Sequence, residues 1–320
     1  MMKWSEKMRR TVEIFDVDII MKLAGNLDEY FNYIEKLLEV EISVQGNELI
    51  MIGKDADKTE ELISNLVDLI KVGDEVDPQK IEYALDLILD NEQTKIADFY
   101  NTTICVTKSG KPVNPKTIGQ KKYVDMIGKK DLIFGIGPAG TGKTYIAVAM
   151  AIRAFKNGQV KRIIITRPAI EAGENLGFLP GDLQSKVDPY LRPIYDAMEE
   201  ILGYETFTSY RERGLVEIAP LAYMRGRTLD HSYIILDEAQ NTTTSQMKMF
   251  LTRFGFGSKV IINGDVTQVD LHKRKSGLSH ALHVLRDLEE IGVMEFTDRD
   301  VMRHTLVKKI IKQYELHEDE

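Results

Sequence analysis

The chain has 320 residues but only one cysteine, Cys105, so no disulfide can form within it and no cysteine cluster can bind zinc. A single cysteine is typical of proteins in a reducing compartment. No apolar run approaches the roughly 20 residues that a membrane-spanning helix needs, and no apolar segment of signal-peptide length follows the charged N-terminus. We therefore expect a cytoplasmic protein with no membrane partner.

The chain also lacks an excess of positive charge. It has 42 Lys and Arg and 50 Asp and Glu, which give a formal net charge of −8. This balance argues against a protein that coats nucleic acid through its overall charge, although it leaves room for a local basic groove. Hydrophobic residues make up 43% and charged residues 29%, as in ordinary globular proteins. The length favours about two domains.

The first hundred residues predict a small α+β domain. Apolar residues recur at helical spacing in some segments, and short β-rich runs flank a tight turn at 45–48. The expected elements, in order, are a helix at Asn26–Val40, two strands at Glu41–Val44 and Leu49–Ile52, and two helices at Asp55–Lys71 and Pro78–Asp90. We predict an N-terminal domain over 1–105. Prolines and lysines gather at 106–117, which we interpret as a linker or an exposed extended segment.

The remaining residues, 118–320, predict an α/β domain. Short apolar runs alternate with helical patterns, which is typical of a mostly parallel sheet with helices on both faces. The expected strands are Leu132–Ile136, Arg162–Thr166, Val216–Ala219, Tyr233–Leu236, Lys259–Asn263 and Val293–Phe296.

A glycine-rich loop follows the first of these strands and satisfies the pattern G-x-x-x-x-G-K-[ST]. Glycines let the main chain wrap closely around phosphate oxygens, and the N–H groups at the following helix N-terminus bind the anion. In this P-loop, Lys143 is expected to reach the β- and γ-phosphates of a nucleotide, and Thr144 to bind Mg²⁺. The eight residues are Gly137, Pro138, Ala139, Gly140, Thr141, Gly142, Lys143 and Thr144.

Two carboxylates follow the strand at Tyr233–Leu236. Asp237 is expected to hold Mg²⁺, because ligands gather at the carboxyl ends of parallel strands. Glu238 is placed to orient and deprotonate an attacking water. The alternative for Glu238 is a solvated acid that caps the next helix.

The strand at Lys259–Asn263 also ends in polar residues. Gln268 is a candidate for a side chain that senses the γ-phosphate or the attacking water. The alternative is an ordinary polar turn.

The motifs GPAGTGKT, LDEAQNTT and NGDVTQVDL, in this order, resemble those of superfamily 1 helicases and, more closely, those of the PhoH family of bacterial ATPases. Residues 167–183, 186–198, 223–229 and 300–307 also resemble that family. The resemblance covers roughly residues 110–316 and implies one RecA-like core, whereas complete helicases have two. Autonomous unwinding is therefore in doubt.

The resemblance implies ATP and Mg²⁺ as cofactors, and a link to RNA metabolism or to the phosphate-starvation response. It places Gln120 where related helicases read adenine; the alternative is a surface helix residue. It also implies a homo-oligomer, in which a ring is one arrangement.

Phosphoryl transfer often uses an arginine finger, for which the candidates are Arg167, Arg225, Arg227 and Arg303. Arg225 and Arg227 are also candidates for contacts to RNA phosphates, and each arginine has the alternative of a surface salt bridge.

The order of elements in the N-terminal domain resembles a KH-type RNA-binding unit, and Gly25 opens a segment like its GXXG loop. The fourth position is Asp28 instead of glycine, so we describe the domain as degenerate KH-like. The alternative is a domain that serves packing or assembly.

Two classes of function follow. The first is a Mg²⁺-dependent ATPase coupled to RNA or to a ribosome-associated protein. The second is an ATP-dependent assembly switch that binds a protein partner and has little intrinsic turnover. A small-molecule kinase is a third and weaker option, because no acceptor pocket is readable.

Overall fold

The computed structural model describes residues 8–89, 99, 102–168, 191–266 and 276–302, together with 307, 310 and 313. It divides into two compact units, a small unit within residues 1–102 and 302–320 and a large unit within residues 103–301. The domain limits expected from the sequence, at 105 and 117, stay a prediction.

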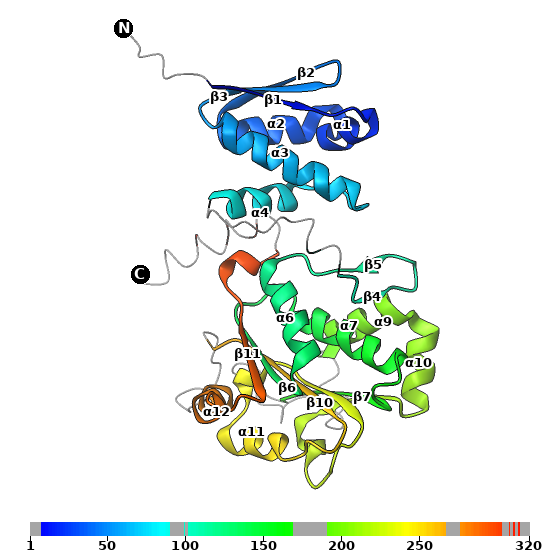
Figure 1. Ribbon diagram of the computed structural model, residues 1–320. Coiled ribbons are helices and arrows are strands. Elements are labelled where there is room, and N and C mark those ends of the chain that lie inside the picture. The colour runs from blue at the N-terminus through cyan, green and yellow to red at the C-terminus, as the bar shows by residue number, and fades with distance from the viewer. Residues whose placement is uncertain are drawn as a thin grey trace. The chain divides into compact units, whose positions relative to one another are not determined.

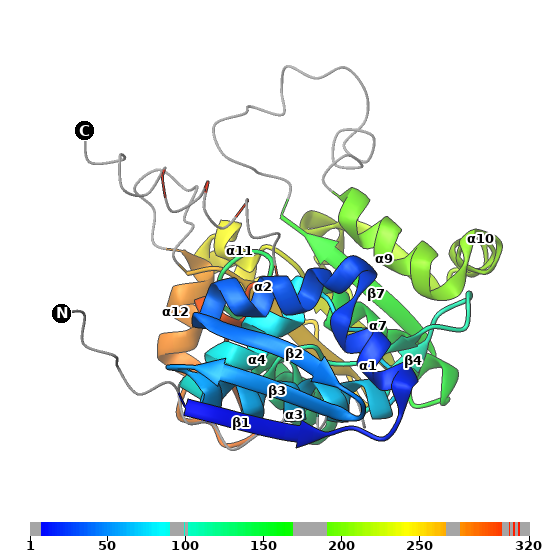
Figure 2. The ribbon, with the colours of Figure 1, turned by 90° about the horizontal axis from the view of Figure 1, so that it is seen from above.

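The small unit is an antiparallel sheet with helices, as the sequence predicted for an α+β region (Figure 2). Its strands run in the spatial order β1-β3-β2. The elements are β1 (Met8–Glu13), α1 (Val17–Ala24), α2 (Glu29–Leu38), β2 (Val40–Gln45), β3 (Glu48–Gly53), α3 (Ala56–Lys71) and α4 (Pro78–Leu89).

Strand β1 and helix α1 precede the order that the sequence predicted. All residues of β1 except Val12 are exposed, so the strand has no alternation of apolar and polar residues from which it can be read. Its position depends on pairing with β3, which places Arg10 opposite Met51. The turn from Gly25 to Asp28 connects α1 to α2.

The large unit contains a sheet of six parallel strands, which confirms the predicted α/β fold (Figure 1). The spatial order is β11-β6-β10-β9-β7-β8. The bounds are β6 (Leu132–Ile136), β7 (Arg162–Arg167), β8 (Val216–Pro220), β9 (Ser232–Leu236), β10 (Lys259–Gly264) and β11 (Ile291–Glu295).

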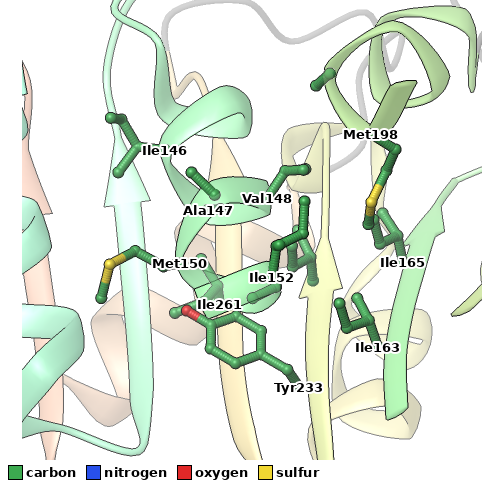
Figure 3. Close-up of a cluster of buried hydrophobic side chains, with 14 of the residues drawn as sticks. Ile146, Ala147, Val148, Met150, Ile152, Ile163, Ile165, Met198, Tyr233 and Ile261 are labelled. Atoms are coloured by element: carbon green, nitrogen blue, oxygen red, sulfur yellow. The ribbon is translucent and has the colours of Figure 1, made fainter. Parts of the chain in front are cut away.

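Helices cover both faces of this sheet (Figure 1). One face packs on α6 (Ile118–Lys129), α7 (Lys143–Lys156), α9 (Arg192–Leu202) and α10 (Tyr204–Glu212), and the other on α11 (Thr244–Leu251) and α12 (Gly277–Leu285). Alternate strand residues supply the two cores: Ile163 and Ile165 contact the α7 side, shown in Figure 3, and Ile164 the α11 side. A sheet buried on both faces explains why its strands read as continuous apolar runs.

A short hairpin, formed by β4 (Cys105–Val106) and β5 (Pro112–Val113), begins one residue before the segment 106–117 and continues into it. Val113 is buried in the core on the α7 side, so this end of the segment packs as part of the large unit. None of the helices in the described part of the chain combines the length and apolar composition of a membrane span.

Candidate functional site

The P-loop lies between β6 and α7, at the carboxyl ends of the parallel strands. Gly137 and Gly142 have φ angles of 146° and 78°, which favour glycine. A Cβ atom on Gly137 would lie 2.6 Å from the carbonyl oxygen of Phe296, and one on Gly142 would lie 2.8 Å from Gln120 Nε2. Both positions therefore need glycine for conformation and for space.

Gln120 contacts this loop from α6 and is only 4% exposed. Its Nε2 donates a hydrogen bond to the carbonyl oxygen of Thr141 at 3.0 Å, and its Oε1 accepts one from the main-chain N–H of Lys116 at 2.8 Å. Gln120 thus fastens the P-loop to the segment before α6. Its role in reading adenine stays a prediction.

Lys143 is the first residue of α7. Its ammonium group donates hydrogen bonds to the carbonyl oxygens of Gly137 and Pro138, at 2.6 and 2.7 Å. The side chain therefore folds along the loop, where its charge lies beside the N-terminus of α7.

Thr144 and Asp237 join two segments that lie 93 residues apart in the sequence, through a hydrogen bond of 2.7 Å from the threonine hydroxyl to Oδ1 of the carboxylate. Asp237 follows β9 and is 4% exposed. Its pKa is raised to about 6, first by burial and then by the charge of Glu238, while the hydrogen bond from Thr144 and the charges of Arg167 and Lys143 act in the opposite direction. The site thus holds a buried carboxylate and a hydroxyl side by side, which are oxygen ligands of the kind that Mg²⁺ prefers.

Glu238 has the left-handed conformation, with φ of 52°. Its Oε2 accepts a hydrogen bond of 2.6 Å from Gln240 Nε2, and its Oε1 lies 3.6 Å from a guanidinium nitrogen of Arg167. Thr243 is the N-cap of α11, with Gln246 completing a capping box. Glu238 is therefore not needed as the cap of that helix.

Lys143, Thr144, Asp237 and Glu238 line one cavity of about 390 Å³. The P-loop and α7 form one wall, and the ends of β9 and β10 contribute Asp237, Glu238 and Asp265. Helix α9 adds Asp196 and Glu200, and the hydroxyl of Tyr145 donates a hydrogen bond of 3.0 Å to Glu200. The cavity thus places several acidic side chains around the P-loop, so a polyanion would need a cation in order to bind there.

The arginine candidates occupy different environments. Arg225 is exposed, whereas Arg227 makes a bidentate ion pair with Glu217, with distances of 2.5 and 2.7 Å. Arg167 lies beside Glu238 as described above. Gln268 and Arg303 lie outside the described residues, as does most of the motif at 167–183.

The sequence did not single out Gln240 or the acidic residues of α9. Gln240 stands inside the motif LDEAQNTT, but its partners become neighbours only in the folded sheet. Asp196 and Glu200 have a helical spacing of four residues, which is equally typical of a solvated helix surface.

The family model described as PhoH-like protein matches residues 112–315, which include every described residue of this cavity. The chain belongs to this family. It is 50% identical over 301 residues to the PhoH-like protein of Bacillus subtilis (strain 168), covering 93% of this chain and 94% of that one.

Other PhoH-like relatives are also similar. The PhoH-like protein of Mycobacterium tuberculosis (strain ATCC 25618 / H37Rv) is 46% identical over 94% of this chain and 86% of its own length. Protein PhoH of Escherichia coli (strain K12) is 47% identical over 63% of this chain and 58% of its own length.

Among solved structures, the large terminase of the thermophilic bacteriophage D6E in complex with ADP is similar, with a TM-score of 0.37 and 14% identity, covering 62% of this chain and 49% of that one. The Pif1 helicase of Candida albicans gives a TM-score of 0.33 and 12% identity, covering 61% of this chain and 42% of that one.

Proposed function

We propose that this PhoH-like chain binds ATP with Mg²⁺ and hydrolyses it. The observation that carries the proposal is the hydrogen bond of 2.7 Å between Thr144 and Asp237, because it brings the P-loop and the acidic end of β9 into one cavity. A P-loop next to such an acid is the arrangement by which P-loop proteins hold a metal-bound triphosphate.

The residues fit Mg²⁺. No group of three or more His, Cys, Asp or Glu side chains in the described part of the chain is arranged to hold a metal alone. Mg²⁺ is usually bound by one or two protein ligands together with waters and substrate phosphates, which Thr144 and Asp237 satisfy. When bound, the ion would neutralise phosphate charge and strengthen the electrophile.

The other residues take the remaining roles. The main-chain N–H groups of the P-loop bind phosphate oxygens, and Lys143 leaves its carbonyl partners to contact the terminal phosphates. Glu238 orients the attacking water and accepts its proton. Gln268 and Arg303 are proposed to assist as sensor and arginine finger, although they lie outside the described residues.

We further propose that turnover is coupled to RNA. Support comes from exposed Arg225, from the helix–turn–helix arrangement around Gly25 in the KH-like unit, and from the family's resemblance to helicases. The proposal includes a cytoplasmic homo-oligomer. A link to the phosphate-starvation response is the wider setting that the family resemblance suggests.

The competing function is an assembly switch in which ATP binding, without turnover, controls a protein partner. The contact of Glu238 with Arg167, at 3.6 Å, favours this alternative, because a base paired with a cation needs a trigger before it can act.

ATP turnover with and without RNA decides between the two, for the wild type, Lys143→Ala and Glu238→Gln. We expect Lys143→Ala to lose binding, and Glu238→Gln to keep binding and lose hydrolysis. Unchanged turnover in Glu238→Gln would remove Glu238 from the reaction. Turnover that ignores RNA, with no RNA retained by the protein, would remove the coupling and leave an ATPase.

A further inference from the structure

The position of Glu238 depends on its neighbours. A left-handed conformation is unfavourable for a residue with a side chain, so it persists only where the surroundings hold it. The main-chain N–H of Asp237 bonds to Thr166, which fixes the chain just before Glu238, and the 3₁₀ helix Ala239–Asn241 fixes it just after. The carboxylate still has rotational freedom that these main-chain contacts leave open.

Gln240 removes this freedom through both ends of its amide. Nε2 donates to Glu238 Oε2 at 2.6 Å, and Oε1 accepts from the main-chain N–H of Asp265 at 3.1 Å. The hydrogen bond from Asp265 fixes the orientation of the Gln240 amide, since a main-chain N–H can donate only to the amide oxygen. The nitrogen end must therefore face Glu238.

The main chain of Gln240 is held as well. Its carbonyl oxygen accepts a hydrogen bond of 3.0 Å from the hydroxyl of Ser276, and the residue is only 2% exposed. Gly264 makes room for it, because a Cβ atom there would lie 3.0 Å from Gln240 Oε1. A buried amide with every polar end engaged has one orientation, so it can transmit that orientation to Glu238.

We propose that Gln240 is a positioning residue for Glu238, which fixes the carboxylate by linking it to the end of β10 at Asp265. The inference rests on the proposed function, in which Glu238 is the base for hydrolysis. Gln240 touches neither nucleotide nor water in this scheme and acts only through Glu238.

Two variants of the full-length chain test the proposal. Gln240→Met keeps the size of the side chain and removes both hydrogen bonds, whereas Gln240→Glu keeps an acceptor for Asp265 but loses the amide N–H that donates to Glu238. The matched control is Gln246→Met, because Gln246 Oε1 accepts from the main-chain N–H of Thr243 on the same segment without touching Glu238.

We expect both Gln240 variants to lower kcat on the order of 10- to 100-fold, since misplacing a reacting group by about 1 Å has an effect of that size. The KM for ATP and the affinity for a fluorescent ATP analogue with Mg²⁺ should stay within about twofold, because binding uses the P-loop. Gln246→Met should keep kcat. A kcat unchanged in both Gln240 variants would overturn the proposal.

A cycle with Glu238→Gln separates positioning from general damage. If Gln240 acts through Glu238, adding Gln240→Met to Glu238→Gln should not lower the residual turnover of Glu238→Gln, measured at high enzyme concentration, any further. An additional loss as large as in the wild-type background would contradict the inference while leaving the ATPase function intact. If Glu238→Gln itself keeps full turnover, the proposed role of Glu238 fails, and the inference fails with it.

Discussion

At the scale of single residues, burial of the Asp237 carboxyl group opposes the ionised form that would bind Mg²⁺. The pKa of this carboxyl group is raised to about 6, first by burial and then by Glu238, so the folded chain takes up a proton more readily than the unfolded chain. A raised pKa of this kind contributes stability that is complete below the unfolded value of 3.8 and is lost as the pH rises through 6. At neutral pH the ionised group therefore destabilises the metal-free protein.

Asp237→Asn should accordingly stabilise the protein while abolishing hydrolysis. Asparagine carries no charge to bury, and its oxygen can still accept the hydrogen bond from Thr144. In metal-free buffer at pH 8 we expect a higher Tm, from a gain on the order of 2 kcal/mol, and little difference at pH 4. Thermal melts at the two pH values check this. A lower Tm at pH 8 would mean that Thr144, Lys143 and Arg167 outweigh the cost of burial.

Arg225 and Arg227 flank a glycine in the sequence but should respond differently to substitution. Arg227→Ala breaks the bidentate pair with Glu217, so we expect a loss of about 1 kcal/mol in stability. Arg225→Ala should leave stability within about 0.5 kcal/mol, because Arg225 is exposed. If RNA contacts this loop, Arg225→Ala should also lower RNA affinity and reduce the salt dependence by about one counterion.

Denaturant unfolding and RNA binding over a range of salt concentrations measure both effects. Equal loss of RNA affinity in the two variants, at unchanged salt dependence, would instead point to an indirect effect of loop structure.

For single residues, the sequence carries the information that lies in a local motif and lacks the information that lies in distant contacts. Thr144 and Asp237 meet as the two motifs suggest, since both follow strands of one parallel sheet. Gln240 is visible in the sequence as part of the motif LDEAQNTT, but its hydrogen bond to Asp265 forms only because β9 and β10 are neighbours in the sheet. The spacing of residues along the sequence does not show that these two strands pair.

At the scale of secondary structure, buried strands were easier to predict than exposed ones. The six predicted strands of the large sheet lie within about two residues of the observed ones, because burial on both faces makes each a continuous apolar run. Strand β1 was missed because its exposed sequence, MRRTVE, has no apolar side to reveal it. The hairpin β4–β5 was missed because its proline and glycine are equally typical of a linker.

Hydrogen bonds to Asp300 hold the start of helix α6 in place. Asp300 Oδ1 accepts hydrogen bonds from the Thr117 hydroxyl at 2.7 Å and from the N–H of Gly119 at 3.0 Å, at the first turn of the helix. A Cβ atom on Gly119 would overlap this carboxylate. Gly119→Ala should therefore destabilise the large unit by about 2 kcal/mol or more, because it disrupts a buried hydrogen-bond network.

Gly128 supplies the matched control on the same helix. A Cβ atom there meets no atom within 4 Å, so Gly128→Ala should stabilise the helix by about 0.5 to 1 kcal/mol. Urea unfolding of both variants measures the contrast. Equal effects would show that the Asp300 network does not fix the start of α6.

At the scale of the whole molecule, the division into two units has a thermodynamic consequence. Every described residue that lines the cavity belongs to the large unit. A ligand that binds only the folded form stabilises what it binds, by about 2.7 kcal/mol at a concentration of 100 Kd. If the small unit opens separately, a nucleotide should leave its local stability unchanged.

Hydrogen exchange with and without Mg²⁺ and a non-hydrolysable ATP analogue tests this prediction. We expect amides of β6, β9 and the P-loop to exchange more slowly, up to about 100-fold where exchange requires unfolding of the large unit. Amides of β2 and β3 should keep their rates, and Lys143→Ala should abolish the protection. Protection that extends to β2 and β3 would mean that the two units open as one cooperative body, so that nucleotide binding also stabilises the small unit.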